Sequence, residues 1–389
     1  MTHPDPPRRY LDNAATSWPK PEPVLAAWES AGRLIGAAPG RGGHRAAVAA
    51  DAIRRRAREQ AARLVGGVDP ARVALPGGAT LALNMAIHGL VRTGDHVIAT
   101  AADHNATLRP LHALRSRGAI TLSIVPCDGL GRVDPADVAA AWSPATRLVV
   151  ATHASNVTGA VQDAAALAAL AHERDGMLVL DAAQSLGQVP GWDDGSGRRA
   201  FNADVVVAPA HKWLCGMGGV AILFARAGLA IESLVQGGTG SASESLEMPS
   251  AFTDLFEAGT PDLPALAALE AAAAWSMGEE GAAAGIRARR LAAACAEGLR
   301  EIRGARVFAA PDGGPPIVGF TLEGYDPAEL AALLEQSAGV QARSGFHCAA
   351  CIHDYLGTRA GGLVRVSFGP FNTAADAAAV VEAVGAFAA

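Results

Sequence analysis

The runs Arg147-Leu-Val-Val-Ala-Thr152, Asp163-Ala-Ala-Ala-Leu-Ala-Ala-Leu-Ala-His-Glu-Arg174 and Met177-Leu-Val-Leu-Asp181 follow one another along the chain. The first and third are short, apolar and rich in β-branched or aliphatic residues, which is typical of buried strands. The middle run has the composition of a helix, with Asp163 at its start and Asp175-Gly176 after its end. Strand, helix and strand at this spacing form a βαβ unit, so we predict an α/β fold with a mostly parallel sheet.

The same alternation continues on both sides, from about Val73 to Phe224, with further strand-like runs at 96–100, 120–125, 204–208 and 219–224. From about Gly259 it gives way to a long alanine-rich helix, more helix and a few strands. We therefore expect a large α/β domain at 17–258 and a smaller α+β domain at 259–389, with 1–16 packing near the smaller one. A length of 389 residues suits two domains.

Composition narrows the class of protein. Half of the residues are apolar and the formal net charge is −6, which gives no general attraction to nucleic acid or to anionic membranes. The chain has no apolar run of membrane-spanning length and no secretory signal pattern. Its five cysteines are widely spread and do not suggest a disulfide framework. We expect a cytoplasmic protein with no nucleic-acid or membrane partner.

Lysine is nearly absent from this chain. Only Lys20 and Lys212 occur among the 32 basic residues, and the others are arginines, which stay protonated and cannot form an imine. Lys20 stands between prolines in Trp18-Pro-Lys-Pro-Glu-Pro, and we interpret this segment as an exposed, extended linker. Lys212 directly follows a predicted strand in Ala208-Pro-Ala-His-Lys212. It is therefore the candidate for Schiff-base chemistry.

Polar side chains follow four of the predicted strands. Asp103-His104 follows one strand, His153-Ala-Ser-Asn156 another, Asp181 ends a third with Gln184 beyond it, and His211-Lys212 follows the fourth. Any one could be an ordinary loop residue. Because ligands bind at the carboxyl ends of strands in open α/β sheets, the four together favour a site.

A glycine turn supplies a possible anion site. Leu75-Pro-Gly-Gly-Ala79-Thr80 precedes a helical pattern, and glycines before a helix start leave backbone N–H groups free for a phosphate. No lysine follows as in a Walker loop, and we find no complete GxGxxG, which counts against a nucleotide site. Pyridoxal phosphate (PLP) requires a lysine, an aspartate and a phosphate-binding turn, and the sequence offers all three. We expect no metal ion in the site.

Eight motifs are distributed over nearly the whole chain. They are Tyr10-Leu-Asp-Asn-Ala-Ala-Thr16, Pro39-Gly-Arg-Gly-Gly-His44, Thr152-His-Ala-Ser-Asn-Val-Thr-Gly159, Asp181-Ala-Ala-Gln184, His211-Lys212, Phe256-Glu-Ala-Gly-Thr-Pro261, Arg343-Ser-Gly-Phe-His-Cys-Ala349 and Arg365-Val-Ser-Phe-Gly-Pro-Phe-Asn-Thr373. In residues and order they resemble the motifs of the cysteine desulfurases, which belong to the class V aminotransferase group of fold-type I PLP-dependent enzymes. The resemblance implies a fold-type I PLP-dependent transferase.

The resemblance implies roles toward the PLP ring. Lys212 would hold PLP through a Schiff base, Asp181 would contact the pyridinium nitrogen, and Gln184 would contact the ring hydroxyl oxygen. His104 would stack on the ring and assist proton transfer, and Asn156 would position the ring and the substrate. The implied activity converts L-cysteine to L-alanine and sulfur bound to the protein.

The resemblance also implies phosphate contacts from Ala79, Thr80 and His211. The threonine of the family's Gly-Thr-Pro motif reaches the phosphate of the partner subunit, so Thr260 implies a homodimer with shared sites.

The remaining implied residues concern the substrate. Arg365 would bind its carboxylate, with Asn156, Arg343 and Asn13 lining the substrate side. Cys348 would take the sulfur as a persulfide, because a thiolate on a reachable loop near a cation is a good nucleophile.

Two positions depart from the family pattern. Pro209 occupies a place where the family usually has a serine or threonine that donates to the phosphate, and proline donates from neither side chain nor backbone. Cys351 makes Cys348-Ala-Ala-Cys351 a CxxC motif. Cys351 could be an incidental cysteine, a redox partner or a metal ligand, and all three interpretations remain open.

The alternative functions are a selenocysteine lyase, a cysteine β-lyase, an aminotransferase and a non-catalytic protein of the same fold. A sulfur-acceptor protein is a possible partner, and the sequence does not identify it.

Overall fold

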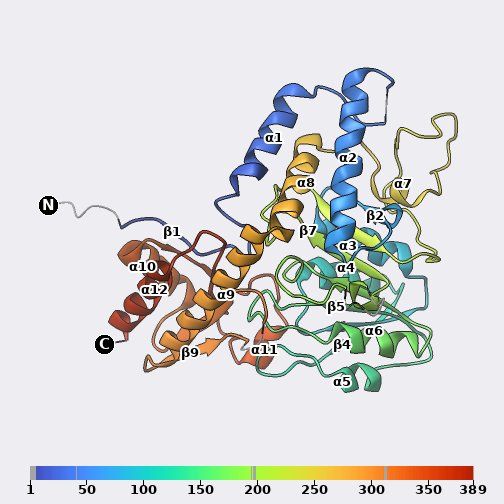
Figure 1. Ribbon diagram of the computed structural model, residues 1–389. Coiled ribbons are helices and arrows are strands. Elements are labelled where there is room, and N and C mark those ends of the chain that lie inside the picture. Colours follow the sequence, from blue (N-terminus) through green and yellow to red (C-terminus); the bar gives the residue numbers. More distant parts are fainter. Residues whose placement is uncertain (1–5, 41, 194, 196–198, 311–312, 389) are drawn as a thin grey trace.

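The computed structural model describes residues 6–40, 42–193, 195, 199–310 and 313–388 (Figure 1). Residues 1–5 of the expected N-terminal segment and Arg41 of the Pro39–His44 motif lie outside the described residues. A long sheet with helices on both faces fills one side of the molecule, and a smaller sheet with its own helices lies beside it, near both ends of the chain (Figure 1).

The large sheet has seven strands in the described residues, in the order β2-β8-β7-β6-β5-β3-β4. The strands are β2 (Val73–Ala74), β3 (His96–Thr100), β4 (Thr121–Val125), β5 (Thr146–Thr152), β6 (Met177–Asp181), β7 (Val205–Pro209) and β8 (Ala221–Ala225). The five neighbouring strands from β7 to the edge strand β4 run parallel, while β8 and β2 join antiparallel at the other edge. The predicted α/β fold with a mostly parallel sheet is confirmed.

Side chains alternate between the two faces of this sheet, as the period of a strand requires. Leu178 and Leu180 of β6 pack into one core, and Val179 between them packs into the other. The first core is covered by helices α2 (Arg45–Leu64), α6 (Ala164–His172) and α8 (Leu263–Met277), and the second by α3 (Ala79–Leu90), α4 (Asn105–Ser116) and α7 (Phe252–Phe256). Burial on both faces explains why these strands read as continuous apolar runs.

Short polar side chains start several of these helices. Asp163 caps α6 by accepting a hydrogen bond from Ala166 N at 2.9 Å, which confirms the predicted helix start. Asp262 does the same for α8 through Ala265 N at 3.0 Å. Helices α1 (Glu22–Leu34) and α5 (Pro135–Ala140) complete this half of the chain. None of the described helices combines the length and apolarity needed to span a lipid bilayer.

The smaller sheet is antiparallel, in the order β12-β13-β10-β9. Its strands are β9 (Ala305–Phe308), β10 (Ile317–Leu322), β12 (Arg343–Gly345) and β13 (Leu363–Ser367), and it packs with α9 (Glu279–Arg300), α10 (Pro327–Ala338) and α12 (Ala374–Phe387) around a third core. The short helix α11 (Ile352–Leu356) lies between β12 and β13. These elements form the expected α+β part of the fold.

The consecutive helices α8 and α9 pack into different hydrophobic cores. Leu266 and Leu269 of α8 belong to the large-sheet core, whereas Cys295 and Leu299 of α9 belong to the third core. Strand β1 (Arg9–Tyr10) pairs with β11 (Val340–Gln341), so the N-terminal segment lies against the smaller unit. Domain bounds of 17–258 and 259–389 stay a prediction, and the packing would place the division nearer Gly278.

Candidate active site

A cavity of about 840 Å³ opens where β5, β6 and β7 end and α3 begins. All the predicted site residues line it except three, Asn13, Thr260 and Cys348. Those that line it are Ala79, Thr80, His104, Asn156, Asp181, Gln184, His211, Lys212, Arg343 and Arg365. The strand-end argument therefore located a real concavity, built from both the large-sheet and the small-sheet parts of the chain.

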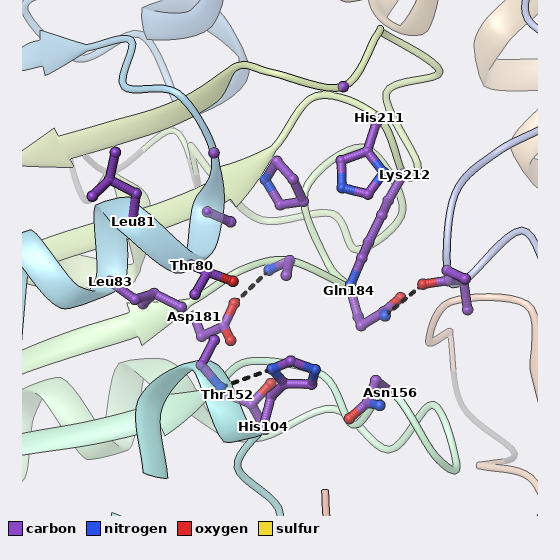
Figure 2. A pocket seen from close by; sticks show the side chains of 18 of the residues that line it. Thr80, Leu81, Leu83, His104, Thr152, Asn156, Asp181, Gln184, His211 and Lys212 are labelled. Carbon is purple, nitrogen blue, oxygen red and sulfur yellow. Dashed lines mark hydrogen bonds between the residues drawn. The ribbon is translucent and has the colours of Figure 1, made fainter. Parts of the chain in front are cut away.

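Lys212 and Asp181 approach each other inside this cavity, where the lysine side chain extends toward the end of β6 (Figure 2). Burial, together with the guanidinium groups of Arg365 and Arg343, lowers the pKa of Lys212 to about 8, while Asp181 opposes the shift. Burial raises the pKa of Asp181, opposed by a hydrogen bond from Ala183 N at 2.9 Å and by Lys212. A fraction of the Lys212 amine is therefore neutral, and hence nucleophilic, near neutral pH.

Both the nitrogen and the oxygen of the Gln184 side-chain amide make hydrogen bonds. Its Nε2 donates to the carbonyl of Ala14 at 3.0 Å, and its Oε1 accepts from Trp213 Nε1 at 2.7 Å. The first bond is drawn in Figure 2. Trp213 directly follows Lys212, so this bond also fixes the backbone beside the lysine. Trp213 was not identified from the sequence, where an aromatic residue next to a lysine carries no signal of its own.

The start of α3 forms an open cradle. Gly78 is the N-cap residue with φ of 152°, a conformation that favours glycine, and it has no side chain to satisfy the first N–H groups of the helix. A Cβ at Gly78 would meet nothing within 4 Å, and one at Gly77 only Leu81 at 3.9 Å. Both glycines, Ala79 and Thr80 line the cavity, so the arrangement suits an anion.

His104 caps α4 while facing the cavity. Its Nδ1 accepts a hydrogen bond from Ala106 N at 3.0 Å, drawn in Figure 2, so in the neutral ring the proton lies on Nε2. Burial lowers the pKa of His104 to about 4, and nearby Lys212 adds to the shift. The ring is therefore neutral at physiological pH, with an N–H available toward the cavity.

The neighbouring Asp103 joins two strand ends. It is fully buried, and its carboxylate accepts from Thr100 N at 2.7 Å and Thr152 N at 2.5 Å, which terminate β3 and β5. Burial raises the pKa of Asp103 to about 7. Its role is to fix the loops that carry His104 and Asn156, a role that the sequence analysis did not assign.

Arg365 is one of the largest fully buried side chains of the described residues. It donates to Asp12 Oδ1 at 2.7 Å and to the carbonyl of Asn156 at 2.8 Å. Its Nε has no partner among the described residues. A buried guanidinium held by one carboxylate, with a donor to spare at a cavity wall, suits a carboxylate ligand.

Cys348 is exposed and lies beside the cavity, outside the residues that form its wall. Its thiol accepts a hydrogen bond from Arg343 Nη2, at 3.7 Å from Sγ. Its carbonyl accepts from Asn105 N at 2.7 Å, and Asn156 Nδ2 donates to the preceding carbonyl of His347 at 2.7 Å. The cysteine loop is thus fastened to the same strand-end loops that carry His104 and Asn156.

Cys351 differs from Cys348 in its surroundings. It is only partly exposed and packs against the two large-sheet cores at the start of α11. Burial, followed by Asp354, raises the pKa of its thiol. A thiol with a raised pKa is a poor nucleophile, so its environment favours the incidental cysteine over a redox partner.

Besides Cys348, two predicted residues lie away from the cavity wall. Asn13 is fully buried and its amide donates to Ser367 O at 2.9 Å and to Asn372 at 3.2 Å, which ties the N-terminal segment to β13. Thr260 is exposed and lies outside this chain's cavity. The N–H of neighbouring Gly259 donates a hydrogen bond to the carbonyl of Gly238 at 2.8 Å, in the loop after β8.

The interpretation of Lys20 as part of an exposed linker holds only in part, because Trp18 and Pro19 are exposed whereas Lys20 itself is partly buried. Its Nζ donates to Ser17 Oγ at 2.8 Å and to the carbonyl of His211 at 3.0 Å, and burial lowers the pKa of Lys20 to about 8. The flanking prolines do extend the chain, but it extends across the loop that carries Lys212. His153 also departs from the strand-end group, because it packs against the rings of Trp192 and Phe201 instead.

Comparison with known proteins finds relatives along nearly the whole chain. Residues 9–380 match the family described as Aminotransferase class-V. Over 378 residues the chain is 30% identical to a protein named "Probable cysteine desulfurase" from Methanothermobacter thermautotrophicus, covering 94% of this chain and 91% of that one.

Two solved structures share the whole fold. The apo cysteine desulfurase of Thermococcus onnurineus has a TM-score of 0.87 at 25% identity, covering 97% of this chain and 94% of that chain. The cysteine desulfurase CsdA of Escherichia coli has a TM-score of 0.84 at 27% identity, with 96% and 93% covered. The resemblance and the fold class that it implied are confirmed.

Proposed function

The chain belongs to the class-V aminotransferase family, and on that premise we propose that it is a PLP-dependent cysteine desulfurase. The proposed reaction converts L-cysteine to L-alanine and leaves the sulfur as a persulfide on Cys348. The observation that carries the proposal is an exposed thiol held by Arg343, a residue of the same cavity wall as Lys212 and Asp181. The relatives named as cysteine desulfurases support it.

The residues present fit PLP, which the family implies. The glycine turn before α3 leaves open space and free backbone donors for a phosphate, and Thr80 stands beside it. Pro209 lines the same cavity without a donor, so His211 and the start of α3 would hold the phosphate. Asp181 is buried where a carboxylate could face a ring nitrogen. When bound, PLP supplies an electron sink for bonds at the α-carbon of an amino acid.

The side chains of this protein would bind the cofactor and the substrate and transfer protons. Lys212 would hold the cofactor covalently and move protons at its Nζ, which its lowered pKa favours. His104, neutral with its proton on Nε2, would stack on the ring and donate toward it. Arg365 would bind the substrate carboxylate and Asn156 would position the substrate. Gln184 would contact the ring through its held amide.

Cys348 would be the acceptor of sulfur. Its exposure lets a second molecule collect the sulfur, and Arg343 Nη2 at 3.7 Å from its Sγ places a guanidinium beside the thiol. Arg343 also lines the cavity, so one guanidinium contacts both the thiol and the space for substrate.

Thr260 supports a homodimer with shared sites as part of the proposal. It is exposed and outside its own chain's cavity, as a residue acting on a partner's phosphate would be. Mixing Lys212→Ala with Thr260→Ala subunits tests this. If Thr260 acts in the partner, each mixed dimer contains one unaltered site, and activity returns on mixing. If Thr260→Ala is inactive alone and mixing restores no activity, Thr260 acts within its own chain. If Thr260→Ala is active alone, Thr260 has no such role.

The experiment that tests the function identifies the product. PLP-loaded protein is given L-cysteine and a reductant, and alanine, sulfide and pyruvate are measured. Equal amounts of alanine and sulfide are expected, lost in Cys348→Ser and retained in the matched control Cys351→Ser. Pyruvate in place of alanine would indicate a β-lyase, and activity indifferent to Cys348 would exclude the persulfide mechanism.

A further inference from the structure

His347 and Cys348 are adjacent but turn in opposite directions. His347 is buried and lines the cavity, whereas Cys348 is exposed. Both have positive φ, 49° and 59°, a left-handed conformation that side-chain-bearing residues rarely adopt. The carbonyls of these two residues are held by Asn156 Nδ2 and Asn105 N, each at 2.7 Å, which fixes the unusual backbone. Such conformations persist where the surroundings impose them, and they cluster at functional sites.

The ring of His347 has one fixed and one free nitrogen. Its Nε2 lies 3.1 Å from the carbonyl of Leu363, which can only accept, so Nε2 carries the proton. Burial, followed by the charge of Arg365, lowers the pKa of His347 well below its usual value, so the ring is neutral. Nδ1 then offers a lone pair, and it is buried without a partner among the described residues. Orphaned buried acceptors are rare and call for an explanation.

The two arginines on this wall of the cavity offer only donors. Arg343 and Arg365 have no lone pairs to offer, and Arg365 Nε is itself unpaired among the described residues. In the proposed function the substrate's carboxylate would go to Arg365 and its amine would react near Lys212. Its sulfur must come close to Cys348, and hence to the segment that contains His347. The substrate atom left in need of an acceptor there is the thiol hydrogen.

We propose that His347 Nδ1 accepts a hydrogen bond from the thiol of the bound substrate and so makes the site select an amino acid with S–H on its β-carbon. The inference rests on the proposed function and names the residue that would recognise the sulfur before transfer. His347 would be a specificity residue, distinct from the nucleophile beside it.

Two variants separate the two nitrogens. Asn places an amide oxygen near the position of Nδ1, whereas Gln places its amide nitrogen near the position of Nε2. His347→Gln therefore keeps a donor for Leu363 O and loses the acceptor, and His347→Asn does the reverse. Both are made in a PLP-loaded Cys348→Ser background, where sulfur transfer is blocked, and L-cysteine and L-alanine are titrated while the cofactor's absorption is followed.

In His347→Gln we expect the dissociation constant of L-cysteine to rise about fivefold, as for one lost hydrogen bond. That of L-alanine, which has no thiol, should not change, and His347→Asn should bind L-cysteine as the unaltered protein does. Equal weakening for both amino acids in His347→Gln, or weakening for L-cysteine only in His347→Asn, would assign His347 a purely structural role and overturn the inference.

The same experiment distinguishes failure of the proposed function. If wild-type protein forms alanine and sulfide but His347→Gln binds L-cysteine normally, the specificity role alone is wrong. If no amino acid changes the absorption of the PLP-loaded protein and no alanine forms, the proposed function and this inference fall together. The unfolding midpoint of each variant shows whether it is folded.

Discussion

The Nζ atom of Lys20 lies 3.0 Å from the carbonyl oxygen of His211, so the two lysines of the chain meet at one loop. The same carbonyl accepts from Ser17 N at 3.0 Å and from the hydroxyls of Thr16 and Ser17 at 3.1 Å each. Four donors from residues 16–20 therefore hold the peptide group that directly precedes Lys212. The position of the reactive amine depends on residues almost two hundred positions earlier in the chain.

Replacing Lys20 with Met should loosen this peptide group. We expect the free energy of unfolding to fall by about 1–2 kcal/mol, as for loss of a charge-assisted hydrogen bond that is partly solvated. PLP should also dissociate faster, because Lys212 is less well positioned. Urea unfolding of the cofactor-free protein and PLP release into buffer measure the two effects. Thr16→Val, which removes one exposed donor, is the control and should change both quantities less.

The rate of PLP binding should rise with pH around the pKa of Lys212. Only the neutral amine reacts with an aldehyde, and burial lowers the pKa of Lys212 to about 8 from 10.5. The rate should therefore increase up to about pH 8 and level off above it, instead of rising to pH 10. Absorption after mixing cofactor-free protein with PLP gives the rate. A rate still climbing tenfold per unit above pH 9 would contradict a lowered pKa.

Removal of the carboxylate at Asp12 should leave Arg365 charged and without its ion-pair partner. We expect Asp12→Ala to lower the free energy of unfolding by about 3 kcal/mol, since a buried charge is left uncompensated. The KM for L-cysteine should rise more than kcat falls, because the guanidinium is no longer aligned. The control is Glu29→Ala, which breaks an exposed pair with Arg33 and should change stability by less than about 0.5 kcal/mol. Equal effects of the two variants would show that the Asp12 pair contributes no more than a surface pair.

Acid should destabilise the protein partly through His153. Burial lowers the pKa of His153 to about 4 in the folded chain, against about 6.5 when unfolded. The unfolded state therefore binds more protons between these values, and the stability that His153 contributes is present above pH 6.5 and lost as the pH falls toward 4. The loss is on the order of 2–3 kcal/mol. The stability of His153→Leu, measured by urea unfolding at pH 7, 5.5 and 4.5, should fall less steeply than that of the wild type. Parallel pH profiles would contradict the assignment.

The sequence predicted what depends on local pattern. Strand-end polarity brought Asp181, Asn156 and Lys212 to one edge of the sheet, because parallel strands align their carboxyl ends. The pairs Asp12–Arg365 and Lys20–His211 were missed, because they join segments far apart in the chain and leave no spacing signal. An extended conformation at Lys20 was predictable from its prolines, but whether an extended segment is covered depends on what folds against it. His153 was misplaced because a strand-end residue can turn either way.

The hydrogen bonds to the main-chain carbonyls of His347 and Cys348 limit how sulfur could be delivered from Cys348. The carbonyls of both residues are tied to the strand-end loops at Asn156 and Asn105, so the thiol cannot travel far from the cavity without breaking two bonds. A long flexible loop could carry a persulfide outward to a distant acceptor. This loop is short and fixed, so any acceptor of sulfur from this protein would have to bring its own reactive atom to Cys348 at the mouth of the cavity.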